Sequence, residues 1–149
     1  MSENNSKLNE LVNASRVIYQ PIYGHHEWDD KAQRFCENRL TDKKIYDDLS
    51  AKLQRPLRVL DLGCCTGYIS LIISSWGGDV TGVDSNKSFL DLGEFLAGEH
   101  PDYKIKFIHT KIEEFIPKIK NDEYDLVLGL SLFHWVTKEI GFKNRRNTS

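Results

Sequence analysis

Cysteine is scarce in this sequence, with three residues among 149, and two of them, Cys64 and Cys65, are adjacent. An odd count and adjacent positions do not suit a disulfide framework, so we expect three reduced thiols. The cysteines and the five histidines also show no C-x-x-C or H-x-x-x-H spacing. The sequence therefore predicts no metal site.

Charge imbalance and long apolar runs are lacking as well. The 20 basic residues are balanced by 22 acidic ones, which leaves no broad basic surface for nucleic acid or anionic lipid. No apolar run approaches the ~18 residues of a membrane span, and the N-terminus lacks the features of a signal peptide. We expect a cytoplasmic protein with one domain and a sizeable core.

The most informative stretch is residues 57–68, where an apolar run ends at Asp61 and two glycines follow. Val59, Leu60 and Leu62 favour a strand. Gly63 and Gly67 allow a tight turn and a close approach of a ligand to the backbone. A helix that begins near Thr66 would direct its free N–H groups toward this turn. The stretch predicts a ligand site at the carboxyl end of a strand.

A second acidic residue supports this prediction. Asp84 ends the apolar stretch 79–84 and lies 21 residues after Gly63. In nucleotide-binding α/β folds, a carboxylate at the end of the second strand, about 20 residues after the glycine turn, accepts hydrogen bonds from ribose hydroxyls. The spacing therefore predicts a cofactor that contains a nucleoside.

The rest of the chain predicts an α/β fold with parallel strands. Helices are expected over residues 7–20, over 29–53 with a break near Thr41, over 86–99 and, weakened by Pro117, over 113–120. Further strands are expected at 104–109 and at 124–130, the latter covered on both faces because it is almost continuously apolar. The aromatic and imidazole side chains of residues 19–28 predict a loop that faces a pocket.

Three stretches resemble the class I S-adenosylmethionine-dependent methyltransferases, whose fold is Rossmann-like. They are V-L-D-L-G-C-C-T-G at 59–67, V-T-G-V-D at 80–84 and Y-D-L-V-L-G-L-S-L-F-H at 124–134, and they look like the first, second and fourth motifs of that family. Two positions depart from the pattern. Cys65 stands where the family usually has glycine, and Lys111 stands where many members place an aspartate that bonds the adenine amine.

Shorter stretches resemble one branch, the methyltransferase domain of bifunctional methyltransferase/kinases that terminate polymannose O-antigen chains of lipopolysaccharide. These stretches are I-Y-Q at 18–20, G-H at 24–25, E-W at 27–28, R-P-L at 55–57, I-E-E at 112–114 and G-L-S-L-F-H at 129–134. The resemblance covers about residues 8 to 136. That branch also has a basic residue before I-E-E, as Lys111 is here.

The resemblance implies an S-adenosylmethionine site. Gly63 and the Leu130 backbone would line the methionine part, Asp84 would hold the ribose with Ser85 beside it, and Ile112 would flank the adenine. Tyr19 and Arg39 would close over the cofactor, and a bidentate Arg39 suits its carboxylate; a solvated helix charge is the alternative for Arg39. The full set of expected cofactor-binding residues is Tyr19, Arg39, Asp61, Gly63, Gly67, Asp84, Ser85, Lys111, Ile112, Glu113 and Leu130.

The acceptor implied by the resemblance is a sugar phosphate or a sugar hydroxyl of a growing O-antigen chain. A phosphate is already an anion, so it needs no general base. For a hydroxyl, His134 is the candidate base because an imidazole titrates near neutrality. A packed or capping histidine is the other interpretation of His134.

The expected organisation is a helical flank over 1–54, a cofactor-binding α/β core over 55–136 and a polar, basic tail over 137–149. A class I methyltransferase needs about three further strands, so the sequence predicts a truncated or frame-shifted domain with an open sheet edge that a protein partner could cover. A non-catalytic binding module is the second hypothesis. A nicotinamide-dependent oxidoreductase is the third, and D-x-G-x-x-x-G differs from its G-x-G-x-x-G turn.

Overall fold

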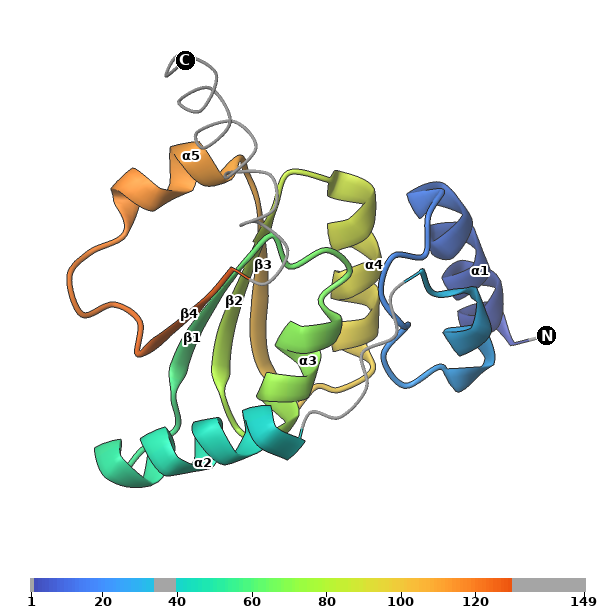
Figure 1. The fold of residues 1–149 in the computed structure, drawn as a ribbon. Helices are drawn as coiled ribbons and strands as arrows, with labels where there is room; N and C mark the ends of the chain where they lie inside the picture. Colours follow the sequence, from blue (N-terminus) through green and yellow to red (C-terminus); the bar gives the residue numbers. More distant parts are fainter. Residues whose placement is uncertain (1, 34–39, 130–149) are drawn as a thin grey trace, which may run out of the picture.

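The computed structural model describes residues 2–33 and 40–129 and has the predicted α/β fold, with helices packed on a four-stranded parallel sheet (Figure 1). The elements in chain order are α1 (Glu3–Ser15), the 3-10 helix η1 (His26–Lys31), α2 (Leu40–Leu53), β1 (Arg58–Leu62), α3 (Tyr68–Ser75), β2 (Asp79–Asp84), α4 (Lys87–Gly98), β3 (Lys104–His109), α5 (Ile112–Phe115), the 3-10 helix η2 (Ile116–Lys118) and β4 (Leu126–Leu128).

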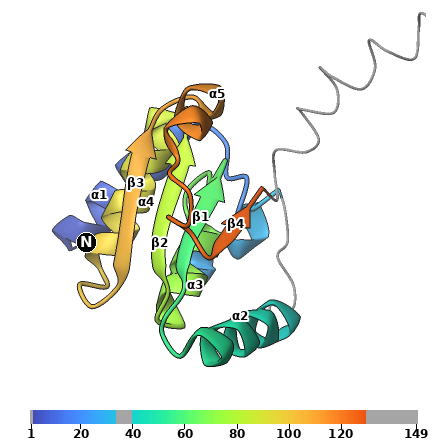
Figure 2. The same cartoon turned by 90° about the vertical axis from the view of Figure 1, so that its left-hand side faces the viewer.

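The strands lie in the order β3-β2-β1-β4, and all three pairings are parallel (Figure 2). The chain builds outward from β1 to β2 and β3, and then returns to place β4 on the other side of β1. This reversal between β1 and β4 is a topological switch point, beside which open α/β sheets bind their ligands. The carboxyl end of β1 is therefore the expected place for a site.

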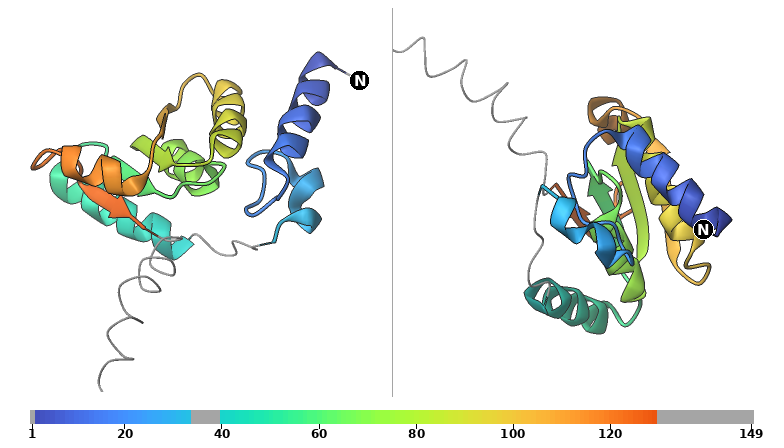
Figure 3. Two further views of the ribbon diagram at one scale, coloured as in Figure 1. Left: turned by 90° about the horizontal axis from the view of Figure 1, so that it is seen from above. Right: turned by 90° about the vertical axis from the view of Figure 1, so that its right-hand side faces the viewer.

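The two faces of the sheet are covered by different helices. On one face, Val59 and Val80 pack against Ile69 and Ile73 of α3, and a second cluster joins α1, α3 and α4. Figure 1 and the left-hand view of Figure 3 show α1 beside α4. On the opposite face, Leu60, Leu62 and Val83 pack against hydrophobic residues of the segment from α5 to Tyr124. The alternation of side chains along each strand produces this division.

The Phe107 ring of β3 packs against three glycines. A Cβ added to Gly67, Gly82 or Gly93 would lie 2.6, 2.8 or 3.1 Å from the nearest Phe107 ring atom. Gly82 is the register partner of Phe107 on β2, whereas Gly67 precedes α3 and Gly93 lies within α4. The missing side chains let α3 and α4 both approach the sheet over this one ring.

Several helix boundaries differ from the sequence prediction. Helix α1 ends at Ser15 because Arg16 adopts φ +61°, a left-handed cap that stops the helix before the predicted residue 20. The predicted break in residues 29–53 does not lie at Thr41, which is within α2; among the described residues the chain is non-helical at Ala32 and Gln33, after η1 ends at Lys31. The predicted helix over 113–120 is a single turn followed by η2, because Pro117 cannot continue an α-helical ladder.

The prediction that the fourth strand is covered on both faces is wrong for the described residues. Leu126 and Leu128 pack against the cluster that contains Val59 and Ile73, whereas Val127 points to the other face and is 54% exposed. An unbroken apolar run does not show which face a neighbouring element covers. The predicted residues of this strand from Leu130 onward lie outside the described part of the chain.

Asp125 joins the start of β4 to the start of β1. Its carboxylate accepts two hydrogen bonds of 2.6 Å from the guanidinium of Arg55 and one of 2.8 Å from the Arg58 backbone N–H. The hydrogen bonds from Arg55, and then those from Arg58, hold the pKa of the Asp125 carboxyl well below its ordinary value. The side chain is only 8% exposed, and these charge-assisted bonds reinforce the ladder between β1 and β4, joining residues 67 to 70 positions apart.

Replacing Asp125 should reduce stability in a way that depends on pH. The Asp125→Asn variant should melt about 5 °C below the parent at pH 7, because hydrogen bonds to a charged group are lost. A carboxyl with a depressed folded pKa contributes its stability above the unfolded pKa of roughly 4, and this contribution disappears as the pH falls further. Melting curves from pH 7 to pH 3 should therefore show the gap between the two proteins closing below about pH 4.

The control is Asp47→Asn, which removes an exposed i, i+4 pair with Lys43 on α2. Its melting temperature should stay within about 1 °C of the parent, as expected for a surface ion pair. Equal effects of the two substitutions would contradict the proposed link between β1 and β4.

The contact between Phe107 and the glycines predicts opposite outcomes for two alanine substitutions. The Gly82→Ala variant should be destabilised by about 1–3 kcal/mol, because the new Cβ overlaps both Phe107 and the Cys64 sulfur. The Gly98→Ala variant should be unchanged or more stable, because the end of α4 has open space at that position. Urea unfolding of both variants tests this, and a Gly82→Ala protein as stable as the parent would mean that the ring can move aside.

Candidate functional site

The turn that follows β1 has a strained backbone. Gly63, Cys65 and Gly67 have φ values of +71°, +57° and +81°. The backbone N–H groups of Gly63 and Cys64 both donate to the Val83 carbonyl, at 2.8 and 3.1 Å, and so draw the turn over the end of β2. Left-handed angles are unfavourable for a residue with a Cβ, so a glycine would adopt the backbone conformation of Cys65 at a lower cost.

The Asp84 carboxylate holds this turn to the end of β2. One oxygen accepts the Cys65 N–H at 2.9 Å, and the other accepts the Asn86 N–H at 2.8 Å. A carboxylate can accept about four hydrogen bonds, so each oxygen has capacity for another donor. The arrangement fixes the orientation of the carboxylate at the carboxyl end of the sheet, where the sequence predicted a partner for ribose hydroxyls.

Gly67 has a packing role in the structure, which places the Phe107 ring where a Cβ would lie. The predicted approach of a ligand to the Gly67 backbone stays a prediction. Gly67 is also the residue before α3, and with no side chain it cannot cap the helix. The Tyr68 N–H instead donates to the Gln20 side-chain oxygen, at 3.4 Å.

Asp61 lies inside the molecule. It is 4% exposed, and its carboxylate accepts a 2.7 Å hydrogen bond from the Ser70 hydroxyl on α3. The residue that leads the glycine motif therefore helps to join β1 to α3. A direct contact between Asp61 and a cofactor stays a prediction.

The two cysteines of the turn are free and buried. Burial raises the pKa of the Cys65 thiol to about 12 and raises the pKa of Cys64 further above its ordinary value. Both side chains are consequently protonated at neutral pH, and neither is an activated nucleophile. Cys36 lies outside the described residues.

The Thr66 hydroxyl is buried away from solvent and has no hydrogen-bond partner in the described part of the chain. The side-chain oxygen is buried, and among the described residues it is the one buried side-chain nitrogen or oxygen without a hydrogen bond. Such a group costs free energy unless it is satisfied. The strained turn, the fixed Asp84 carboxylate and this hydroxyl together suit a polar ligand at the carboxyl end of β1.

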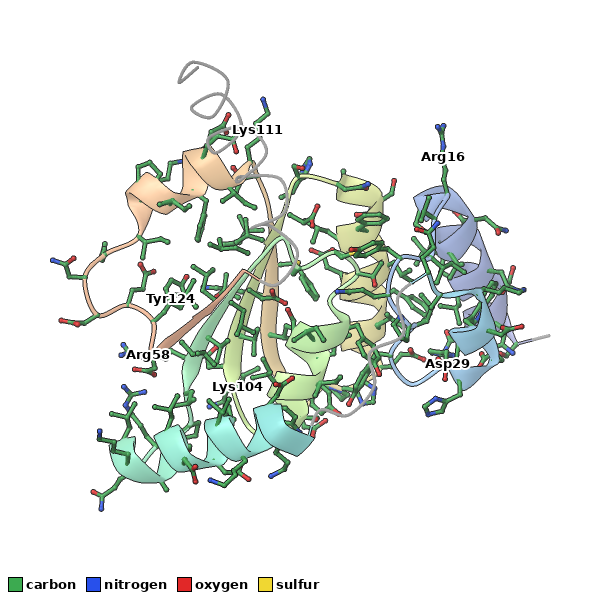
Figure 4. All side chains as sticks on the ribbon, in the orientation of Figure 1. Arg16, Asp29, Arg58, Lys104, Lys111 and Tyr124 are labelled. Atoms are coloured by element: carbon green, nitrogen blue, oxygen red, sulfur yellow. The ribbon has the colours of Figure 1, made fainter. Side chains whose placement is uncertain are left out.

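The other predicted residues directly follow β2 and β3, and so lie at the same end of the sheet. Ser85 is exposed, and its carbonyl accepts a 2.9 Å hydrogen bond from His109 at the end of β3. Ile112 is half-buried beside the cluster of Leu60, Leu62 and Val83. Lys111 and Glu113 are exposed, and Figure 4 shows Lys111 pointing away from the sheet. The fold thus brings Gly63, Asp84, Ser85 and Ile112 to one end of the sheet.

The predicted N-terminal residues are only partly described. Tyr19 is half-buried and directly precedes Gln20. Arg39, Leu130 and the candidate base His134 lie outside the described residues, so their predicted roles are untested by the structure. Sequence reasoning gave no role to Gln20 or Thr66; the signals for Gln20 were its place in the I-Y-Q stretch at 18–20 and its polarity within the apolar stretch 17–23.

The loop rich in aromatic residues does line a cavity, as predicted. The cavity has a volume of about 320 Å³. Its walls come from the loop itself, from Tyr68 at the start of α3 and from His100 after α4. A second, apolar cavity of about 240 Å³ lies between α2, α3 and β4. The first is lined by Pro21, Ile22, Tyr23, Gly24, His26, Asp29, Tyr68 and His100.

Residues 2–33 and 40–129 contain neither a membrane-spanning helix nor a cluster of metal ligands. None of the helices there has the length and apolar character needed to cross a membrane. No group of three or more His, Cys, Asp or Glu side chains is placed to hold a metal ion in the same part of the chain.

Comparison with known proteins finds relatives that are named methyltransferases. The chain is 44% identical over 130 residues to the O-antigen chain terminator bifunctional methyltransferase/kinase WbdD of Escherichia coli, which covers 87% of this chain and 18% of that protein. It is 35% identical over 95 residues to a ubiquinone biosynthesis O-methyltransferase of Rickettsia typhi, covering 63% of this chain and 35% of the relative. The chain therefore spans less than a fifth of the length of WbdD.

Solved structures give the same result. A 2.2 Å crystal structure of WbdD matches with a TM-score of 0.86 and 42% identity, over 92% of this chain and 31% of that one. Magnesium protoporphyrin IX methyltransferase from Synechocystis, solved with bound SAM, matches with a TM-score of 0.55 over 93% of this chain and 67% of that one; at 20% identity it shows a shared fold alone.

The family match rests on the elements described above. It covers residues 59–144, and so includes β1 from Val59 onward, the glycine turn, β2 with Asp84, and the strands β3 and β4. This span is more than half of the chain. The protein with the Gly63 turn and the Asp84 carboxylate at its switch point belongs to the methyltransferase domain family.

Proposed function

We propose that this chain binds S-adenosylmethionine at the carboxyl ends of β1, β2 and β3 and presents it as the donor in a methyl transfer. The observation that carries the proposal is the Asp84 carboxylate, which is oriented by the Cys65 and Asn86 N–H groups. Its remaining lone pairs suit the two ribose hydroxyls of the cofactor. Membership of the methyltransferase domain family supports the same donor.

The proposed site assigns a part of the cofactor to each element. The turn at Gly63, with the unpaired Thr66 hydroxyl, would hold the methionine end, and Asp84 with Ser85 would hold the ribose. Ile112 would supply an apolar wall for the adenine, with Lys111 and Glu113 at its rim. Tyr19 would close the site from the N-terminal side, together with the predicted contributions of Arg39 and Leu130.

S-adenosylmethionine, when bound, supplies a methyl group on a sulfonium sulfur. The residues of this chain then have to hold the donor, align it with the acceptor and exclude water, since an in-line displacement depends mainly on alignment. The buried thiols of Cys64 and Cys65 take no part as nucleophiles. His134 is the proposed base if the acceptor is a hydroxyl, and no base is needed for a phosphate.

The proposed acceptor is the terminal sugar of a glycan, at a phosphate or a hydroxyl. The similarity to WbdD, whose name describes an O-antigen chain terminator, supports a role in lipopolysaccharide biosynthesis on the cytoplasmic side of the cell. A non-catalytic binding module is the second candidate, because the Asp84 carboxylate that carries the proposal bears on binding of the donor and not on the transfer itself. Release of S-adenosylhomocysteine in the presence of phosphorylated or plain mannosides would distinguish the enzyme from the binding module.

Removal of the Asp84 carboxylate tests the proposed cofactor site. The Asp84→Ala variant should lose roughly 1.5–3 kcal/mol of binding free energy for S-adenosylmethionine, which is about a 10- to 150-fold weaker affinity. The measurement is isothermal titration calorimetry with S-adenosylmethionine and, separately, with NAD, which the parent should not bind.

Asp79→Ala is the matched control, since Asp79 is exposed at the opposite end of the same strand. It should bind the cofactor as the parent does. Equal affinities of the parent and a folded Asp84→Ala variant would refute the proposed site, and binding of NAD alone would favour an oxidoreductase.

The glycine turn gives a second test. A valine at Gly63 obstructs a left-handed position at the proposed point of contact, so the Gly63→Val variant should show no measurable binding of S-adenosylmethionine. Gly77→Val is the control, because Gly77 also has a positive φ, +98°, but lies in open space after α3. Both variants carry comparable backbone strain, so only a loss confined to Gly63→Val supports the assignment; binding within about threefold of the parent would contradict it.

A further inference from the structure

Side-chain hydrogen bonds join the loop before η1 to the connection between α4 and β3, residues 99–103. The Tyr23 hydroxyl bonds the Tyr103 hydroxyl at 2.8 Å, and the His25 ring bonds the Glu99 carboxylate at 2.7 Å. The first bond joins two neutral groups. The second depends on the protonation state of the imidazole.

Both nitrogens of the His25 ring face carboxylates. Nε2 lies 2.7 Å from Oε1 of Glu99, and Nδ1 lies 3.2 Å from Oε1 of Glu27. An ionised carboxylate only accepts hydrogen bonds, and a neutral imidazole donates from one of its two nitrogens. The two bonds therefore form together only when the ring is doubly protonated and carries a positive charge.

The surroundings of the ring favour this charge. The His25 side chain is only 18% exposed, and the side of Glu27 toward α1 is lined by the uncharged Asn5, Leu8 and Asn9. Burial lowers the pKa of the His25 ring, but the hydrogen bonds with Glu99 and then with Glu27 outweigh burial, so the pKa is raised above its ordinary value. The other titratable groups of the two segments near the ring are His26 with its partner Asp29, Lys31 over the Trp28 ring, His100 and Asp102.

The bond between His25 and Glu99 spans the cavity of about 320 Å³. Gly24 and His26, on either side of His25, line one wall of this cavity. His100, which follows Glu99, lines the facing part. The ion pair therefore ties together two walls that come from segments 74 positions apart.

We propose that His25 is a pH-dependent latch, which holds the loop of residues 21–26 against the end of α4 and closes this cavity while the ring is charged. A histidine whose folded pKa is raised contributes its full stability below the unfolded pKa of about 6.5, and this contribution is lost as the pH rises through the folded pKa. The latch is thus closed in mildly acidic solution and released toward alkaline pH. It works through residues outside the proposed cofactor site.

An NMR titration of the His25 ring in the full 149-residue chain tests the charge directly. The midpoint in the parent should lie above the ordinary value of about 6.5, and Glu99→Gln should lower it, because the carboxylate closest to the ring is lost. A parent midpoint at or below about 6.5, or equal midpoints in the parent and Glu99→Gln, would overturn the latch.

Melting curves between pH 6 and pH 9 test its contribution to stability. The His25→Gln variant, which removes the charge, should melt about 4 °C below the parent at pH 6 and within about 1 °C of it at pH 9. Tyr23→Phe is the matched control, because it removes the neutral bond between the same two segments. Burial, and then the hydrogen bond with Tyr23, raise the pKa of Tyr103 to about 12, so the deficit of Tyr23→Phe should be equal at both pH values. A His25→Gln deficit that is equally independent of pH would mean a structural contact alone.

Hydrogen exchange shows whether the loop itself is released. The His25 N–H donates to the Ile22 carbonyl at 3.0 Å, and the Trp28 N–H donates to the His25 carbonyl at 3.1 Å. The protection factors of these two amides, corrected for intrinsic exchange, should fall about tenfold in the parent between pH 6 and pH 9. In His25→Gln they should be low at both pH values. Equal protection of the parent at both pH values would show that the walls stay joined without the charge, and would overturn the proposal.

Discussion

The contact of the Phe107 ring with the backbone of Gly67, Gly82 and Gly93 sets the spacing on which the rest of the fold depends. A side chain at any of these positions would push the ring, a helix or a strand outward. Gly67 is at once a neighbour of Phe107 and the last residue of the turn. The position of the turn is therefore determined by how closely α3 and α4 pack on β2 and β3. The geometry of the candidate site depends in turn on the packing of the core.

The Asp84 carboxylate connects that core to the proposed chemistry. It receives two backbone N–H groups from different segments, and so fixes the turn after β1 relative to the start of α4. The same carboxylate is the proposed ribose acceptor. Stability and affinity are thus linked at one residue, which is why a variant there has to be compared with one at the opposite end of β2.

The N-terminal segment belongs to the same arrangement. Its helix α1 packs on α4, Ile22 enters the core, and Gln20 reaches the start of α3. Residues that precede the α/β core by up to 50 positions therefore contribute packing and a helix cap beside the turn. Residues before and after the central strands thus both stabilise the sheet. Asp125, near the end of the described residues, fixes β4 to β1 by accepting the Arg58 N–H.

The sequence by itself determined the α/β class, the limits of β2 and β3, and the family. These follow from local rules: apolar runs end at polar residues, and motif spacing fixes how far apart two strand ends lie in the chain. The ends of α1 and α5 were decided by the left-handed Arg16 and by Pro117, and the exposure of Val127 among the described residues was decided by which elements pack on each face of the sheet. The contact of Gly67 with Phe107, the orphaned Thr66 hydroxyl and the Gln20 cap were decided only by the tertiary structure. Each joins residues distant in sequence, and local pattern carries no information about the partner that packing supplies.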